Sequence, residues 1–227
     1  MTAAALQIEP ARLLVRDLGC CAYAETLALQ EHLVAAVGAA TQREQLLLVE
    51  HPPVYTLGRG ADAADLRGAP QRLGVPEFRV GRGGGATFHG PGQLVAYPIV
   101  RLRGGGRDVA GYVRTLEQSL IDTCAHYGIE ARAPQGETGV WVGARKIGSI
   151  GIGVKRGVAY HGIALNVRTD LSWFEPIIVC RSAGLALTSM AELLDDAPRV
   201  GAVGQVFARA LAARLGCALE AEGAPWL

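Results

Sequence analysis

Residues 138–167, TGVWVGARKIGSIGIGVKRGVAYHGIALNV, determine the fold class that the sequence predicts. Val, Ile, Trp and Tyr recur between glycines, and turn signals lie near Gly143-Ala144 and at Lys155-Arg156-Gly157. This pattern predicts three strands, over residues 139–142, 146–154 and 158–166. Strands joined by such short turns pair in antiparallel fashion, so the segment predicts a meander within an antiparallel sheet.

The predicted helices occupy separate blocks on both sides of this meander. Residues 21–40 are rich in Ala, Leu, Glu and Gln and carry apolar residues at near-helical spacing. Asp108 is an N-cap for a helix that ends near Tyr127, and residues 200–215 form a last amphipathic helix. The buried face of the second helix is predicted to contain Val109, Val113, Leu116, Leu120 and Cys124. Further strands are predicted at residues 13–15, 45–50, 54–58, 94–100 and 217–220.

Strands that mostly form hairpins, with helices in separate blocks, favour an α+β two-layer fold over a doubly wound α/β fold. The chain of 227 residues is long enough for a sizeable core, so residues 1–227 are predicted to be a single domain. Half of the residues are hydrophobic and the formal net charge is only +1. These values argue against a disordered chain, a nucleic-acid-binding protein and a membrane-surface protein.

The N-terminal and cysteine patterns predict a cytoplasmic location. Residues 1–10 lack the basic segment and apolar run of a signal peptide, and no apolar run approaches the roughly eighteen residues of a membrane span. The five cysteines are odd in number and irregular in spacing, which does not suggest a disulfide framework. They also lack the paired spacing of zinc ligands, so no metal is predicted.

Residues 82–93, RGGGATFHGPGQ, form a glycine-dense stretch that has no aliphatic anchor of its own. Glycine lets a backbone approach a ligand closely, so the stretch is predicted to be the wall of a site, held by the apolar strand that follows. A relaxed dinucleotide fingerprint should open a helix, whereas a proline and a strand follow here, and the chain has no P-loop motif. The pattern alone leaves open a glycine-rich hairpin with a buried, hydrogen-bonded His89.

Two further blocks accompany this stretch, residues 50–59 (EHPPVYTLGR) and residues 145–151 (RKIGSIG). In order and spacing, the three blocks resemble the lipoyl(octanoyl) transferases of the LipB type. The resemblance implies the fold of biotin and lipoate protein ligases, a mixed, largely antiparallel sheet with helices packed on one face. It also implies octanoyl transfer, without a cofactor, from octanoyl-acyl carrier protein to a lysine of a lipoyl domain. The implied acceptors are 2-oxoacid dehydrogenase E2 subunits and the glycine cleavage H protein.

The same resemblance implies the residues of the site. Cys180 is the nucleophile that carries the acyl group, and Lys146 is its proton-transfer partner. The substrate-binding residues are Arg82, Gly83, Gly84, Gly85, Ala86, Thr87, Phe88, His89, Ser149, Ile150, Gly151, Gly162, Ile163 and Ala164. The family usually frames the nucleophile as Pro-Cys-Gly, whereas this chain has Val179-Cys180-Arg181, which removes a fixed φ and adds a cation beside the thiol.

Several alternatives remain open at this point. Lys146 lies in an apolar run, so it is either a snorkelling edge residue or a desolvated amine, and the resemblance favours the amine. His89 suits either a Cys-His dyad or a positioning role, and we assign it to positioning the donor. The arginines of residues 101–107 form either a solvated loop or a docking patch for an acidic partner. The rival functions are an ATP-dependent lipoate or biotin ligase, a Cys-dependent acyl hydrolase and a non-catalytic acyl-carrier binding module.

Overall fold

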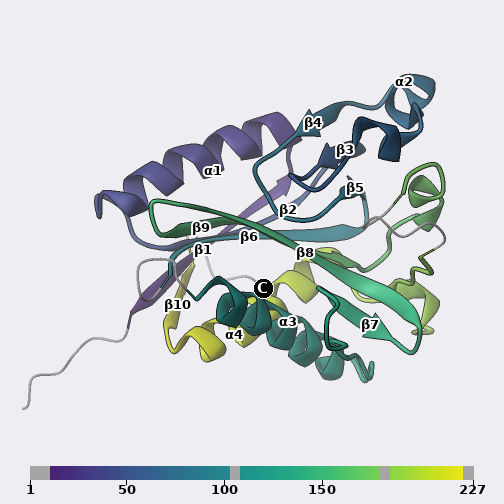
Figure 1. Ribbon diagram of the computed structural model, residues 1–227. Helices are drawn as coiled ribbons and strands as arrows, with labels where there is room; N and C mark the ends of the chain where they lie inside the picture. The colour runs from purple at the N-terminus through teal and green to yellow at the C-terminus, as the bar shows by residue number, and fades with distance from the viewer. Residues whose placement is uncertain (1–10, 103–107, 179–184, 222–227) are drawn as a thin grey trace, which may run out of the picture.

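The computed structural model describes residues 11–102, 108–178 and 185–221, and a seven-stranded sheet is its centre (Figure 1). The strand order is β10-β1-β2-β6-β9-β8-β7. β1 pairs in parallel with β2 and β10, and the other neighbours are antiparallel. The strands are β1 (Arg12–Cys20), β2 (Gln45–Glu50), β6 (Gln93–Arg101), β7 (Val140–Val142), β8 (Arg145–Lys155), β9 (Val158–Asn166) and β10 (Ala218–Ala221). The predicted meander, β7-β8-β9, and the mixed, largely antiparallel sheet are confirmed.

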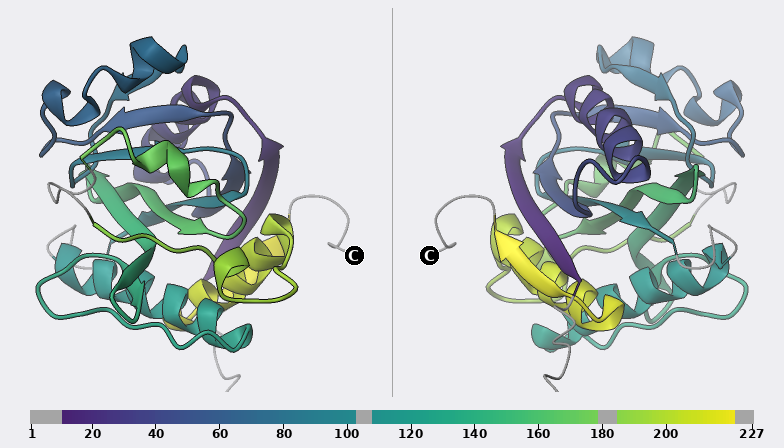
Figure 2. Two further views of the ribbon diagram at one scale, coloured as in Figure 1. Left: turned by 90° about the vertical axis from the view of Figure 1, so that its right-hand side faces the viewer. Right: turned by 90° about the vertical axis from the view of Figure 1, so that its left-hand side faces the viewer.

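Helices cover both faces of this sheet, so the expectation that they pack on one face is wrong (Figures 1 and 2). α1 (Tyr23–Gly38) packs on one face, and α3 (Val109–His126) and α4 (Val200–Leu215) pack on the other. The reason lies in β2, where Leu46 and Leu48 join the core under α3 and α4 while Leu47 and Val49 join the core under α1. A strand that is apolar without alternation is buried on both sides.

A second, three-stranded sheet of order β4-β3-β5 lies on the α1 side of the molecule (Figure 1). It consists of β3 (Val54–Leu57), β4 (Glu77–Arg79) and β5 (Ala86–His89). The middle of the glycine-rich stretch, residues 86–89, is therefore a strand. Between β3 and β4 the chain forms the short helices η1 (Ala63–Leu66) and α2 (Ala69–Leu73). The sheet has its own small core, in which the Phe88 ring stacks on Trp173 of η3 (Leu171–Phe174) at 5.2 Å.

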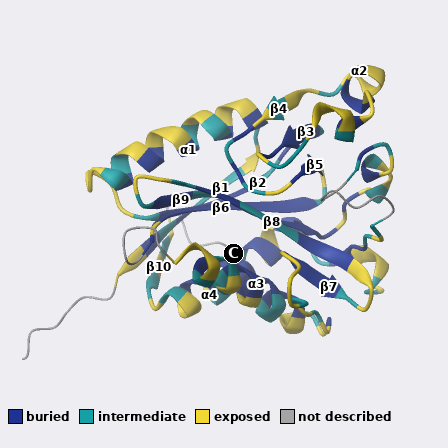
Figure 3. Cartoon of the chain, in the orientation of Figure 1, coloured by how far each residue is buried: buried dark blue, intermediate teal, exposed yellow. Residues whose placement is uncertain are grey.

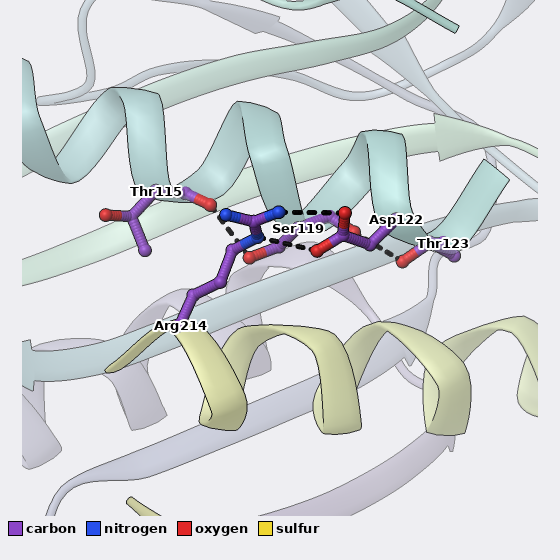
Figure 4. A network of polar contacts seen from close by, with 5 residues as sticks. All are labelled: Thr115, Ser119, Asp122, Thr123 and Arg214. Carbon is purple, nitrogen blue, oxygen red and sulfur yellow. Dashed lines mark hydrogen bonds and ion pairs between the residues drawn. The ribbon is translucent and has the colours of Figure 1, made fainter. Parts of the chain in front are cut away.

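α3 and α4 lie side by side and are joined at their surface. Arg214 of α4 donates to both carboxylate oxygens of Asp122 on α3, at 2.6 and 2.8 Å (Figure 4). Asp108 accepts from the Gly111 N–H at 2.8 Å, as an N-cap should. The buried stripe of α3 begins at Tyr112, so Val109, at the first helical position, stays 36% exposed, contrary to the prediction. Figure 3 shows how burial divides the molecule: the strands in the middle are buried, and the helices on either side have exposed outer faces.

Candidate active site

A cleft lies between the glycine-rich stretch and the strands β6, β8 and β9, with about 500 Å³ of empty space when the part open to solvent is counted. Of the predicted substrate-binding residues, all but Gly83 and Phe88 line it. These are Arg82, Gly84, Gly85, Ala86, Thr87, His89, Ser149, Ile150, Gly151, Gly162, Ile163 and Ala164. Three segments that are far apart in the sequence therefore meet at one cleft.

Arg82 holds the glycine-rich wall in shape. Its guanidinium donates to the carbonyls of Gly83 and Gly85, each at 3.0 Å, and to the carbonyl and hydroxyl oxygens of Thr56 at 3.0 and 2.8 Å. The Gly83 N–H donates to the Ile152 carbonyl of β8 at 2.8 Å, which fixes the wall to the large sheet. A predicted substrate-binding arginine is thus also the internal brace of the loop.

Glycine is needed at different positions around the cleft for different structural reasons. Gly84 has a φ of +85°, which favours glycine, and a Cβ at this position would meet only an Arg82 nitrogen at 3.5 Å. At Gly162 a Cβ would lie 2.2 Å from the Ala96 carbonyl oxygen, so glycine is needed there for close approach to β6. Glycine therefore leaves open space beside the cleft at Gly84, whereas at Gly162 it permits the close packing of β9 on β6.

Lys146 is a buried amine on β8 that does not itself line the cleft. The residue is 3% exposed, which excludes the snorkelling alternative. Its Nζ donates to the Thr138 carbonyl at 2.8 Å and lies over the Trp141 ring, 4.6 Å from the centroid. Its backbone N–H and carbonyl bond to Ala186 and Thr188, both at 2.9 Å.

A β-bulge sets the direction of Lys146. The pairing of β7 with β8 passes from Val140 and Gly148 to Trp141 and Lys146, so Ile147 is the extra residue. Residues three apart in a regular strand lie on opposite faces, but one extra residue between them restores the same face. Lys146 therefore lies on the same face of β8 as Ser149, which lines the cleft. The predicted nucleophile Cys180, with Val179 and Arg181, lies outside the described residues.

Two buried histidines, His89 and His161, line the cleft, and a third, His51, lies beside His89. The partners of His51 and His89 assign their protons. His51 Nδ1 donates to the Cys21 carbonyl at 2.7 Å, so its Nε2 accepts from the Tyr97 hydroxyl at 2.8 Å. His89 Nδ1 donates to Gln93 Oε1 at 2.8 Å, because the Gln93 amide nitrogen donates to Asn166 Oδ1 at 3.0 Å. His89 is thus both hydrogen-bonded and part of the cleft, which joins the two alternatives that the sequence left open.

Burial keeps these histidines neutral. It lowers the pKa of His51 to about 4, and burial together with the nearby His51 lowers the pKa of His89 to about 3. Burial and the charges of Arg82 and Arg59 lower the pKa of His161 to about 4, and burial raises the pKa of the Tyr23 hydroxyl to about 12. Near neutral pH the cleft therefore has uncharged imidazole and phenol groups.

A family model described as the lipoyl protein ligase A/B catalytic domain matches residues 22–212, which is most of the chain. The chain belongs to this family. Curated relatives of this lipoyl protein ligase A/B domain are octanoyltransferases. The one from Geobacter metallireducens is 44% identical over 194 residues, covering 84% of this chain and 88% of the relative. The one from Solibacter usitatus is 50% identical over 184 residues, covering 79% and 82%. The predicted family and acyltransferase class are thereby confirmed.

Solved structures confirm the fold of this lipoyl protein ligase A/B domain. A lipoate-protein ligase A bound with ATP has a TM-score of 0.72 at 17% identity, covering 94% of this chain and 88% of the other. A bi-partite lipoate protein ligase from Thermoplasma acidophilum has a TM-score of 0.70 at 16% identity, covering 95% and 87%. The predicted α+β fold of the lipoate protein ligase type is therefore present.

The described residues contain neither a cluster suited to a metal ion nor a helix suited to a membrane. Within residues 11–102, 108–178 and 185–221, no three His, Cys, Asp or Glu side chains gather as a metal site would require. Among the helices that the structure describes, none combines the length and hydropathy needed to cross a membrane.

The sequence analysis missed four residues that line the cleft, Tyr23, Val95, Tyr97 and His161. His161 has a φ of +57°, and its backbone N–H donates to Gln30 Oε1 at 2.9 Å. Both of its ring nitrogens are buried without a hydrogen-bond partner among the described residues. A buried polar group in a sparsely populated conformation is typical of functional sites. The sequence signal was a histidine followed by glycine inside an otherwise apolar strand.

Composition held one further unused signal. Of the 22 basic residues in the chain, only Lys146 and Lys155 are lysines, and the rest are arginines. Arginine cannot lose its proton in a protein, whereas lysine can. In a chain that otherwise uses arginine, a lysine buried at residue 146 indicates a need for an amine that can deprotonate.

The histidine cluster predicts a loss of stability in acid. Because the folded pKa values of His51 and His161 lie near 4, below the ordinary 6.5, only the unfolded chain takes up protons between these values. Stability is therefore full above about pH 6.5 and falls as the pH drops towards 4, by roughly 3 kcal/mol for one such histidine. Urea unfolding at pH 7 and pH 4.5 measures this loss.

The variant His161→Gln should lose less stability than the unaltered protein between these two pH values. The matched control is His32→Gln at an exposed position of α1, which should leave the difference unchanged. Equal losses in His161→Gln and the unaltered protein would show that His161 already titrates normally in the fold.

Proposed function

We propose that this chain transfers an octanoyl group from octanoyl-acyl carrier protein to a lysine of a lipoyl domain, through a thioester on Cys180. The observation that carries the proposal is the buried Lys146 amine, placed by the Ile147 bulge on the cleft face of β8. A buried, hydrogen-bonded amine on the cleft face of β8 suits proton transfer during acyl transfer. The predicted substrate-binding residues, Arg82 to His89, Ser149 to Gly151 and Gly162 to Ala164, would surround the acyl chain.

In the first half-reaction the Lys146 ammonium stabilises the Cys180 thiolate. The thiolate attacks the thioester carbonyl of the donor, and the bond from that carbonyl to the pantetheine sulfur breaks. The departing sulfur takes a proton from Lys146, so the products are the acylated Cys180, a free pantetheine thiol and a neutral Lys146 amine.

In the second half-reaction the neutral Lys146 amine serves as the base. It accepts a proton from the lysine of the lipoyl domain as that nitrogen attacks the Cys180 thioester. The amide bond forms, the Cys180 thiolate leaves, and the Lys146 ammonium is restored beside it. The incoming lysine reacts as the neutral amine, having left one proton in the solvent, and the cycle returns Cys180 and Lys146 to their starting state.

The rival Cys-His dyad is weakened by the environment of His89. A general base works best when its pKa lies near the working pH, whereas burial and His51 lower the pKa of His89 to about 3. Its hydrogen bond to Gln93 and its ring stacking on Tyr23, 6.1 Å apart at 9°, suit a positioning group. We therefore assign His89 to orienting the donor.

The partners and location form the remainder of the proposal. The acceptors would be lipoyl domains of 2-oxoacid dehydrogenase E2 subunits and the glycine cleavage H protein, whose domains share an exposed target lysine. A cytoplasmic location would keep the Cys180 thiol reduced. The docking role of the arginines in residues 101–107 stays a prediction, because residues 103–107 lie outside the described part of the chain.

The test is transfer without a nucleotide. Purified chain, octanoyl-acyl carrier protein and apo lipoyl domain, incubated without ATP or magnesium, should yield a lipoyl domain with octanoylated lysine, measured by mass spectrometry. A parallel sample with free octanoate, ATP and magnesium should yield none. In the proposed reaction the acyl group arrives already activated as a thioester, and the chain does not activate a free acid. A strict ATP requirement would instead favour the ligase alternative.

A further inference from the structure

One peptide group links a buried carboxylate to Lys146. The N–H of Gly139 donates to Glu117 Oε1 at 3.2 Å, and the carbonyl of Thr138 accepts from Lys146 Nζ at 2.8 Å. These two groups belong to the same peptide bond, between Thr138 and Gly139. A peptide bond is planar, so its N–H and C=O point in opposite directions and a contact at one end fixes the other.

The surrounding structure leaves this peptide little freedom. Gly139 has a φ of +125°, and a Cβ there would lie 2.5 Å from the Gly148 carbonyl oxygen and 2.7 Å from Lys146 Cε. Glycine is therefore required, and Lys146 passes directly beside its Cα. Glu117 reaches the peptide from α3, where it is 8% exposed and its neighbours Leu116 and Leu120 are fully buried.

A buried carboxylate in this position affects more than geometry. A hydrogen bond from an N–H to an ionised acceptor is about twice as strong as a neutral one. Bonds in a chain also polarise one another, so a carboxylate at the N–H end makes the carbonyl oxygen a better acceptor. The Thr138 carbonyl would then hold the Lys146 ammonium more firmly than an ordinary carbonyl would.

We propose that Glu117 is a positioning residue for Lys146, which it holds in place and in its ammonium form through the peptide bond between Thr138 and Gly139. The inference rests on the proposed function, because it gives Glu117 a role only if Lys146 takes part in the reaction. Nothing in the sequence motifs singles out Glu117, since it lies within an ordinary helix.

Other charged side chains near Lys146 are less suited to this role. Arg145 pairs with Glu192 at 2.8 Å, and Glu192 also accepts from the Thr188 hydroxyl at 2.9 Å. The side chains of Arg145 and Glu192 are 44% and 45% exposed, so solvent screens this pair. Glu117 is thus the buried acid among the described charged groups of this network.

The first readout needs no enzyme activity. With only two lysines, the chain labelled with ¹³C,¹⁵N-lysine gives one set of NMR side-chain signals for Lys146 and one for Lys155, which lies exposed at the end of β8. The variant Lys155→Arg assigns them. In Glu117→Gln, the Lys146 signals should move, because a negative charge is lost from the group that holds the peptide. The signals of Lys155 should stay in place.

The matched control is Glu137→Gln. Glu137 is exposed and lies two residues before Gly139, so this variant also removes one negative charge near the peptide, without touching the peptide contact. It should leave the Lys146 signals unchanged. Lys146 signals that respond equally to both variants, or to neither, would overturn the proposal.

The second readout separates this inference from the proposed function. Loading of Cys180 from octanoyl-acyl carrier protein should slow about tenfold in Glu117→Gln, which keeps an acceptor oxygen but loses the charge, and more in Glu117→Ala. If the unaltered protein forms no adduct, the proposed function fails. If it does and both Glu117 variants load like it, only the inference fails.

Discussion

Cys180→Ala forms no covalent octanoyl adduct and transfers no octanoyl group, if the role assigned to Cys180 is right. Without the thiolate, no group in the proposed cycle can hold the acyl chain between donor and acceptor, so the loss should be complete rather than partial. Intact-protein mass spectrometry after exposure to octanoyl-acyl carrier protein measures the adduct. Unchanged thermal unfolding of the variant shows that the fold is preserved.

The matched control is Cys217→Ala, which removes a partly buried cysteine elsewhere in the chain and should load normally. Burial raises the pKa of the Cys217 thiol, and it raises that of Cys124 to about 12, so neither thiol is an effective nucleophile near neutral pH. Octanoyl label mapped to Cys20, Cys21, Cys124 or Cys217 would contradict the mechanism. It would also mean that Cys180, framed by Val179 and Arg181 instead of the usual Pro and Gly, is not the nucleophile of this chain.

Lys146 variants should separate the two halves of the reaction. Lys146→Ala should load slowly, faster at higher pH where Cys180 ionises unaided, and should then stall before transfer. Lys146→Arg keeps a cation beside the thiol but cannot accept a proton, so it should load better than Lys146→Ala and still stall. Loss of a general base costs on the order of 10²–10⁴ in rate, and rapid-quench measurements of loading and transfer give the two rates separately.

The control for this pair is Lys155→Arg at the exposed end of β8, which should load and transfer normally. His89→Ala, with its positioning role only, should still acylate Cys180 and keep the same pH dependence of loading. Transfer by Lys146→Arg at the rate of the unaltered protein would show that the incoming lysine loses its proton to another group.

The sequence predicted the strands well wherever local patterning decides them. The alternation and turn signals of residues 138–167 gave β7, β8 and β9 within a residue or two, and the capped helix after Asp108 and the helix Val200–Leu215 match closely. The face of the sheet that α1 covers was predicted wrongly, because tertiary packing decides which helix covers which face of a sheet. The unbroken apolar run of β2 was the available sign that both faces are covered.

The cleft was predictable only through the resemblance of three sequence blocks, since spacing alone could not bring residues 82–89 beside residues 161–164. Two features around Lys146 could not be predicted from the sequence at all. The extra residue Ile147 changes the face of Lys146, and the peptide between Thr138 and Gly139 joins Glu117 to its amine. The bulge depends on how the β7-β8 hairpin pairs, the peptide contact depends on where α3 packs, and neither leaves a pattern in the residues themselves.

The pairing of β10 with β1 bears on how the molecule assembles after synthesis. Arg12 pairs with Ala218, so the edge of the sheet joins residues from near the two ends of the described chain. While the ribosome is still making the protein, β1 lacks this neighbour, and contacts between distant residues form slowly. An unpaired strand edge invites contact with other chains. Glu220, which pairs with Arg43 at 2.7 Å, puts charge on the short strand that closes this edge, so truncation before β10 should raise aggregation during expression more than it lowers activity.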